Sequence, residues 1–203
     1  MTEHWLGRGT SFTDYSTRAA FFDSKRGPVL PKDAKLNGIS IPASGSTRFT
    51  NGAQLFGITH RWQIIANLSG TVPAIDDSVQ APNVFHVTFP RPNLDTISKS
   101  VGFTCTYGNP GTDSVTVVIY YDSVETVALF DSSIHHSRLA PISVSVPNTG
   151  SYSVSSVLLA SLPNSGVIQV WVIADRSKTI TISGRKYLIA SVSRARTFSF
   201  IKS

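Results

Sequence analysis

Cysteine, methionine and glutamate are scarce in this chain of 203 residues. There is one cysteine (Cys105), one methionine and only two glutamates, Glu3 and Glu125. A single cysteine cannot form an intrachain disulfide or a zinc site of the multi-cysteine type. The shortage of glutamate and methionine argues against a helix bundle, because these residues are strong helix formers.

Long apolar runs are also missing. No stretch approaches the roughly 20 residues that a membrane-spanning helix needs. The first residues, MTEHW, lack the basic start and apolar core of a secretory signal. We therefore expect a chain that is made in the cytoplasm and has no membrane span. Apolar residues nevertheless make up 41%, which is enough for a packed core.

Charge is sparse, and most of the basic excess lies near the two ends. Charged residues make up 15%, with 18 basic against 12 acidic side chains and a net charge of +6. A candidate basic patch near the C-terminus consists of Arg185, Lys186, Arg194 and Arg196. The spacing of Arg194 and Arg196 places both on one face of a strand. Such a patch could neutralise phosphates, but solvated outward positions explain it more simply, so nucleic acid is not the favoured partner.

Residues 1–50 show no sustained period, and glycines and prolines interrupt every short pattern. Aromatic residues nevertheless recur there more often than in a disordered tail. This composition predicts an extended arm that docks on the body of the chain or on a neighbouring subunit. The candidate assembly residues of this arm are Trp5, Phe12, Tyr15, Phe21 and Phe22.

Residues 51–70 change to a helical period. Five apolar residues recur at intervals of three or four, which predicts one face of an amphipathic helix over about 52–68. Asn51 would cap its start, and Gly70 and Pro73 would end it. The predicted packing face consists of Leu55, Ile58, Trp62, Ile65 and Leu68.

Residues 71–203 favour strands and turns. Alternating or β-branched runs are separated by turn signals such as 108–111, 147–150 and 163–166. About eight or nine short strands without intervening helices predict antiparallel pairing. We expect an all-β fold, an antiparallel β-sandwich of the immunoglobulin or fibronectin kind, with a jelly roll as the alternative.

Motifs that carry catalysis are absent. The chain has no GxSxG, HExxH, GxxxxGK[ST] or GxGxxG pattern. His135 and His136 are adjacent, so on extended backbone they point apart. Cys105 lies inside an apolar strand and is interpreted as a small buried hydrophobe. We expect no enzyme activity, no cofactor and no metal site.

Three aromatic residues could stack on a sugar ring if they are exposed: Tyr120, Tyr121 and Trp171. Trp171 stands between Val170 and Val172 in an apolar run, so a core position is the simpler interpretation. If these rings are exposed, they would indicate a carbohydrate- or host-surface-binding module.

The segments 52–56 (GAQLF), 61–62 (RW), 70–73 (GTVP) and 184–187 (GRKY) surround the Ser/Thr-rich sandwich sequence. In this order the chain resembles small phage and viral structural proteins that place a helix before an immunoglobulin-like domain. The resemblance implies a non-enzymatic virion component, whether capsid-associated, decoration or fibre/tail subunit. We expect it to associate with copies of itself or with other virion subunits through its arm and helix. A carbohydrate-binding module remains the alternative.

Overall fold

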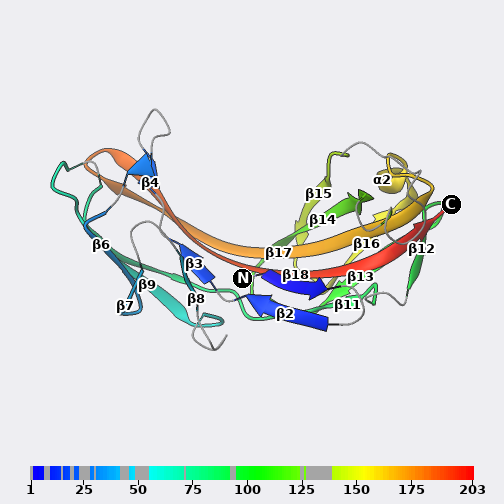
Figure 1. Cartoon of the computed structure of the whole chain (residues 1–203), viewed down its shortest axis with the longest axis horizontal. Helices are drawn as coiled ribbons and strands as arrows, with labels where there is room; N and C mark the ends of the chain where they lie inside the picture. The colour runs from blue at the N-terminus through cyan, green and yellow to red at the C-terminus, as the bar shows by residue number, and fades with distance from the viewer. Residues whose placement is uncertain are drawn as a thin grey trace. The chain divides into compact units, whose positions relative to one another are not determined.

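The computed structural model describes residues 31–41, 55–70, 72–91, 95–123, 126 and 139–203, together with the backbone of six short strands nearer the N-terminus. The predicted all-β class is confirmed, because strands dominate every described part of the chain (Figure 1). The six N-terminal strands pair as β1 with β2, β3 with β8, and β4 with β5. Their bounds are β1 Thr2–Leu6, β2 Thr10–Asp14, β3 Ser16–Arg18, β4 Phe21–Phe22, β5 Pro28–Val29 and β8 Ser46–Arg48.

The chain forms two compact units, and both are discontinuous in sequence. Unit 1 takes Asp14–Val84 and Asp175–Val192. Unit 2 takes Thr2–Thr13, Phe85–Ala174 and Ser193–Ser203. Each unit has its own cluster of buried apolar side chains, so each can be described as a separate packing problem.

Unit 1 contains a four-stranded antiparallel sheet in the order β10-β9-β6-β7. Its core includes Leu36, Ile64 and Val72, and the hairpin formed by the two last strands adds Ile189 to it. The strands are β6 Asp33–Leu36, β7 Ile39–Ser40, β9 Thr59–Ile65 and β10 Ile75–Gln80.

The predicted amphipathic helix over 51–70 is wrong where the structure describes the segment. Residues 59–65 form β9, which pairs with β6 on one side and β10 on the other. The predicted capping residue Asn51 lies outside the described residues.

The helical spacing misled because the buried face of β9 includes a polar residue. His60 and Ile64 are buried, with the half-buried Trp62 between them, which is a period of two. Of the predicted helix face, Leu55 is buried before the strand begins and Ile58 is half-buried, while Ile65 and Leu68 are exposed. Pairing on both sides of β9 satisfies its backbone in a way that a local pattern does not reveal.

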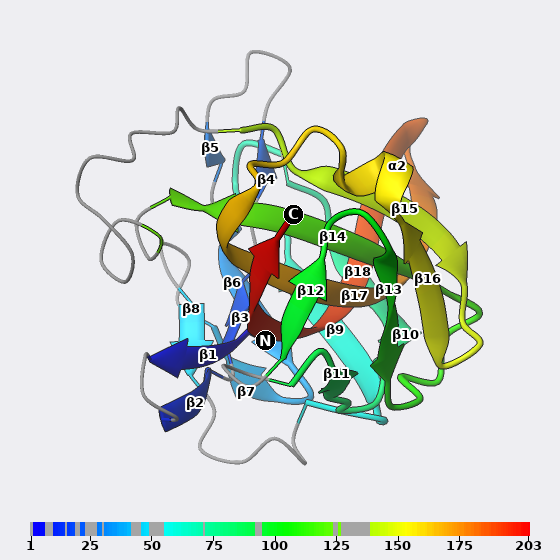
Figure 2. The ribbon, with the colours of Figure 1, turned by 90° about the vertical axis from the view of Figure 1, so that its right-hand side faces the viewer.

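Besides the β1–β2 pair, unit 2 contains two larger sheets, whose strands are labelled in Figure 2. One sheet has the order β11-β13-β16, and the other has the order β12-β18-β17-β14-β15. A single helical turn, α2 Ser156–Leu159, follows β16 and is capped by Ser155. The strands are β11 Val87–Phe89, β12 Thr96–Ser98, β13 Gly102–Tyr107, β14 Ser114–Asp122, β15 Ile142–Pro147, β16 Ser151–Ser155, β17 Ser165–Ile182 and β18 Arg185–Lys202.

The core of unit 2 draws on both of its larger sheets. Cys105 and Val154 come from the three-stranded sheet, and Val117, Ile168 and Val172 come from the five-stranded sheet. The two sheets therefore face each other across one apolar layer, which is the arrangement of a β-sandwich.

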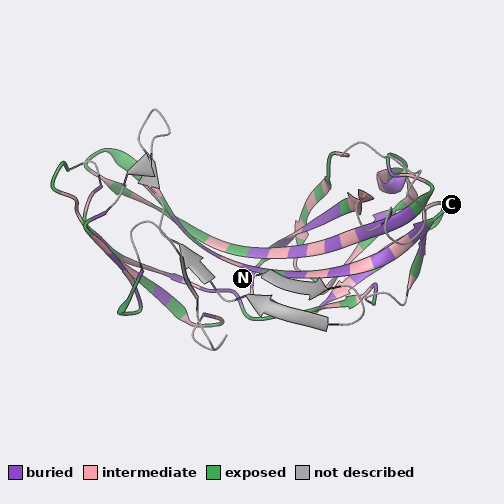
Figure 3. Cartoon of the chain, viewed as in Figure 1, coloured by how far each residue is buried: buried purple, intermediate pink, exposed green. Residues whose placement is uncertain are grey.

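Burial alternates along the two long strands, as the banding in Figure 3 shows. Within unit 2, the even-numbered residues 168–174 of β17 and the odd-numbered residues 193–201 of β18 are buried. The residues between them form the outer face of the five-stranded sheet, which faces away from the sandwich core.

Candidate functional site

The outer face of the five-stranded sheet gathers aromatic and polar side chains from three neighbouring strands. The β14–β17 register places Tyr120 opposite Gln169 and Val118 opposite Trp171. Strand β18 adds Arg196 and Phe198 from the other side of β17. We define the Trp171 cluster as Tyr120, Asp122, Gln169, Trp171, Arg196 and Phe198.

Trp171 is held between its neighbours by aromatic and cation–π contacts. The Tyr120 and Trp171 ring centroids are 6.0 Å apart, with the rings inclined at 70°. The Arg196 guanidinium carbon lies 5.1 Å from the Trp171 ring centroid and 5.0 Å from that of Phe198. An edge-to-face pair and a guanidinium over an indole are both electrostatically favourable arrangements. Arg196 covers one face of the indole. Tyr120 is the more exposed ring of the pair, with 40% of its surface accessible.

A chain of hydrogen bonds fixes the edge of the same indole. Trp171 Nε1 donates to Gln169 Oε1 over 3.0 Å. Gln169 Nε2 in turn donates to Asp122 Oδ2 over 2.6 Å. Because each group orients the next, the amide and the carboxylate are positioned before any ligand arrives.

The predicted stacking residues separate into two groups. Tyr120 and Trp171 do lie together on the outer face. Tyr121 lies on the opposite face, packs against the sandwich core, and its hydroxyl donates to the Ser165 carbonyl over 3.2 Å. Successive residues of a strand point to opposite faces, so adjacent tyrosines could not both join the cluster.

The four residues of the predicted basic patch lie in two places. Arg194 and Arg196 share the outer face of β18 in unit 2, as their spacing predicts. Arg185 and Lys186 belong to unit 1, where they follow the tight turn at Ser183 and Gly184, both with positive φ. Positive φ at both central residues identifies a type I′ hairpin turn.

Several polar residues that could have formed a catalytic or metal site have structural partners instead. In unit 1, Asp76 binds Arg61 through two hydrogen bonds, and Asp77 binds Lys178 over 2.7 Å. These carboxylates lie on β10. His60 Nε2 is 2.8 Å from the Leu55 carbonyl, and burial lowers the pKa of its imidazole. Residues 31–41, 55–70, 72–91, 95–123, 126 and 139–203 contain no group of three metal-ligating side chains.

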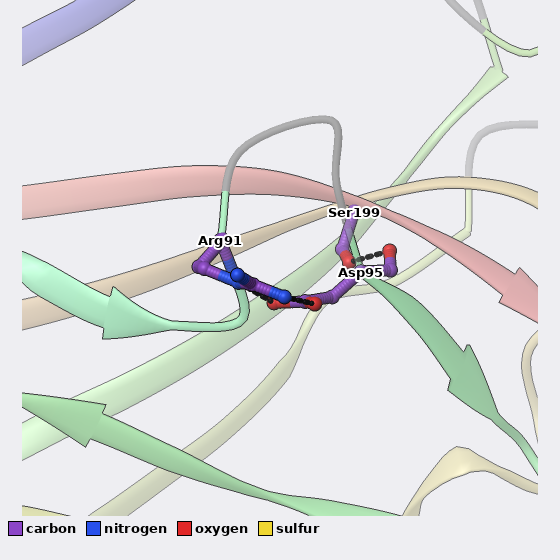
Figure 4. Close-up of polar contacts among 3 residues, drawn as sticks. All are labelled: Arg91, Asp95 and Ser199. Carbon is purple, nitrogen blue, oxygen red and sulfur yellow. Dashed lines mark hydrogen bonds and ion pairs between the residues drawn. The ribbon is translucent and has the colours of Figure 1, made fainter.

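In unit 2, Arg91 and Asp95 close a short loop (Figure 4). Arg91 Nη2 donates to Asp95 Oδ1 over 2.8 Å, and the Arg91 backbone N–H donates to Asp95 Oδ2 over 2.6 Å. The Ser199 hydroxyl donates to the Asp95 backbone carbonyl over 2.6 Å. The Asp95 carboxylate therefore binds Arg91, and its carbonyl joins residue 95 to β18.

The side chains of the predicted arm residues Trp5, Phe12, Tyr15, Phe21 and Phe22 lie outside those that the structure describes. Cys105 is fully buried, as predicted from its apolar strand. In the described ranges, no helix has the length and apolar character to span a bilayer.

Comparisons with known proteins give no family. No protein-family model matches the chain, and no curated protein matches it. Among solved structures, it is similar to a tri-modular GH5 (subfamily 4) endo-β-1,4-glucanase from Bacillus licheniformis, with 12% identity and a TM-score of 0.28. The similarity covers 94% of this chain and 36% of the glucanase chain. A TM-score of this size carries no argument about fold or function, so the site has to be interpreted from its own geometry.

Proposed function

We propose that the chain is a non-enzymatic binding module for carbohydrate, and that the ligand lies on the outer face of the five-stranded sheet. The observation that carries the proposal is the position of the exposed Tyr120 ring beside the fixed indole, amide and carboxylate of the Trp171 cluster. A sugar ring has apolar C–H faces and a polar rim. Its binding site therefore needs an aromatic surface next to hydrogen-bonding groups.

The two kinds of group have different roles in the proposed site. Tyr120 supplies the aromatic surface, since Arg196 already covers the Trp171 ring. Trp171 supports Tyr120 through the edge-to-face contact. Gln169, Asp122 and Arg196 lie on the same face and offer donors and acceptors to sugar hydroxyls. Groups that are ordered in advance lose little conformational freedom on binding, which favours affinity.

Affinity electrophoresis tests this proposal, with the full chain run through gels containing hydroxyethyl cellulose, xylan or polygalacturonate. We expect at least one polysaccharide to retard the chain. Tyr120→Ala should weaken that retardation by up to about tenfold, the size of an aromatic contact of roughly 1.5 kcal/mol. Tyr120→Phe should keep most of it because the ring remains.

The matched control is Val157→Ala, which removes an exposed apolar side chain from α2. This variant should be retarded like the unmodified chain. The proposal is contradicted if no gel retards the chain, or if Tyr120→Ala and Val157→Ala behave alike.

A second candidate is a structural assembly protein of a virion, whose copies associate with each other or with other virion subunits. One observation favours it. Strand β15 ends the order of the five-stranded sheet and carries no charged side chain from Ile142 to Pro147. Natural sheet edges that must not pair usually carry charges, prolines or bulges. The prolines here lie only at the two ends of β15, at 141 and 147. This candidate function includes location in a virion. It is tested by the solution mass of the full chain, determined by sedimentation equilibrium.

A further inference from the structure

Among the described strands, β15 lies at the edge of its sheet, and its sequence is symmetric. From 141 to 147 the chain reads PISVSVP, so residues at equal distances from Val144 are of the same chemical kind. Pro141 matches Pro147, Ile142 matches Val146, and Ser143 matches Ser145. An antiparallel pair formed by two copies of this segment would therefore place like side chains opposite each other.

The hydrogen bonds to β14 show which backbone groups point outward. β15 pairs with β14 so that Val144 lies opposite Val117, and Asn148 N–H donates to the Asp113 carbonyl over 2.9 Å. Hydrogen-bonded and non-hydrogen-bonded pairs alternate along an antiparallel ladder. Asn148 and Asp113 form one hydrogen-bonded pair. Counting back from Asn148 in steps of two, the backbone N–H and C=O groups of residues 146, 144 and 142 point toward β14. The backbone polar groups of the odd-numbered residues 141–147 point away from β14, toward the edge of the sheet.

The prolines then confine pairing to the centre of the strand. Pro141 and Pro147 have no N–H, so the outward donors of this edge are the N–H groups of Ser143 and Ser145. An antiparallel register centred on Val144 lets the Ser143 and Ser145 N–H groups of each copy donate to the Ser145 and Ser143 carbonyls of the other copy. A shift by one residue would set the outward backbone groups of one copy opposite groups of the other copy that point toward β14, so the donors would lose their acceptors.

The side chains are compatible with this register. Ser143 and Ser145 are exposed on the outer face, and Ile142 and Val146 are partly buried and pack against the sandwich core. Within the described part of the chain, β14 is the one strand that pairs with β15. The segment carries no charge that would repel a second copy.

From this symmetry we infer that β15 is a homodimer interface, in which two copies pair antiparallel about Val144 and join their five-stranded sheets. This inference rests on the assembly candidate, to which it gives a specific interface, and it is independent of carbohydrate binding. The partner is a second copy because the donors, the prolines and the side chains of this edge all have the same centre of symmetry.

Two double variants of the full chain test the interface by sedimentation equilibrium over a concentration series. In the inferred dimer, Ser143 of one copy lies opposite Ser145 of the other. S143K/S145K therefore places lysine opposite lysine twice and should give a monomer. S143K/S145E places lysine opposite glutamate twice and should keep the dimer. Both variants alter the same two exposed positions, so a folding defect is checked by comparing their circular dichroism.

The unmodified chain should approach twice its mass of 21.9 kDa as concentration rises. A chain that remains monomeric through the series would overturn both this interface and self-association. An oligomer whose mass is the same in S143K/S145K would overturn the β15 interface and leave assembly through another surface standing. Loss of the dimer in both double variants would overturn the register centred on Val144, because parallel pairing, or antiparallel pairing centred on Ser143 or Ser145, places like charges together in each.

Discussion

At the scale of single residues, Cys105 illustrates how burial determines reactivity. The thiol is fully buried in the core of unit 2, and desolvation raises its pKa to about 12. A thiol reacts as its thiolate, and at neutral pH almost none of this group is ionised. Cys105 therefore has the properties of a core residue and not of a nucleophile.

We expect the native chain to resist a thiol reagent such as 5,5′-dithiobis(2-nitrobenzoic acid) and to react fully in denaturant. The reaction under native conditions should follow the opening of the sandwich, because the thiol must first be exposed. Absorbance of the released thiolate measures both rates. Rapid and complete labelling of the native chain would contradict the buried position.

Asp95 makes a prediction about pH. The side-chain and backbone hydrogen bonds from Arg91 lower the pKa of the Asp95 carboxyl. A carboxyl whose pKa is lower in the folded state stabilises the fold above its unfolded pKa, and this contribution is lost as pH falls through the lowered folded pKa. Asp95→Asn should therefore destabilise the chain at pH 7, and the difference should shrink in acid.

Urea unfolding from pH 7 down to the acid range measures this dependence. Asp113→Asn, at an exposed aspartate of the same unit, serves as the matched control and should have a smaller effect at pH 7. A difference between Asp95→Asn and the unmodified chain that stays constant with pH would show that the Arg91 contacts do not depend on ionisation.

At the scale of elements, the close approach of β13 and β16 depends on Gly102. This residue has φ of +83°, and a Cβ there would collide with the Val154 carbonyl oxygen. Gly150, in the same unit, has a similar φ of +82°, but a Cβ there would make only an ordinary contact, 3.7 Å from the Tyr107 carbonyl oxygen. The two glycines therefore separate the cost of positive φ from the cost of the clash.

Gly150→Ala should lower the free energy of unfolding by about 1–2 kcal/mol, the cost of a left-handed conformation for a residue with a Cβ. Gly102→Ala carries the same cost and should lose a further 1–3 kcal/mol or so because backbone has to move. Chemical denaturation followed by circular dichroism gives both values. Equal losses would mean that the strands separate at Gly102 without strain.

The elements also show where a local pattern succeeds. The predicted turn signals at 108–111 and 147–150 do lie between strands, the first between β13 and β14 and the second between β15 and β16. Each turn signal follows a strand that contains β-branched residues. The helix prediction was wrong over 59–65 because His60 occupies a buried position of the strand, and a polar residue there conceals the period of two.

At the scale of the whole molecule, the arrangement of the last two strands was not apparent from sequence. We expected only short strands over 71–203, whereas β17 runs continuously from Ser165 to Ile182. Polar residues 175–178 interrupt the apolar pattern, and they belong to unit 1 and not to unit 2. Lys178 binds Asp77, a partner 101 residues away in sequence, and no local rule predicts such a contact.

The Trp171 cluster was anticipated only in part, for the same reason. The sequence singled out Trp171 and Tyr120 as aromatic and placed Arg194 and Arg196 on one strand face. It could not predict that Arg196 would lie over the Trp171 ring, or that Gln169 would join that indole to Asp122. These contacts depend on which strands are neighbours in the sheet.

The sequence by itself determined the all-β class, the buried state of Cys105, and the face shared by Arg194 and Arg196, because composition and a period of two express local preferences of the backbone. Only the tertiary structure decided that 59–65 is a strand, that 175–192 packs with 14–84, and that Tyr120, Trp171 and Arg196 meet. Those outcomes depend on the long-range pairing of strands, whose hydrogen bonds and buried surface outweigh local propensity.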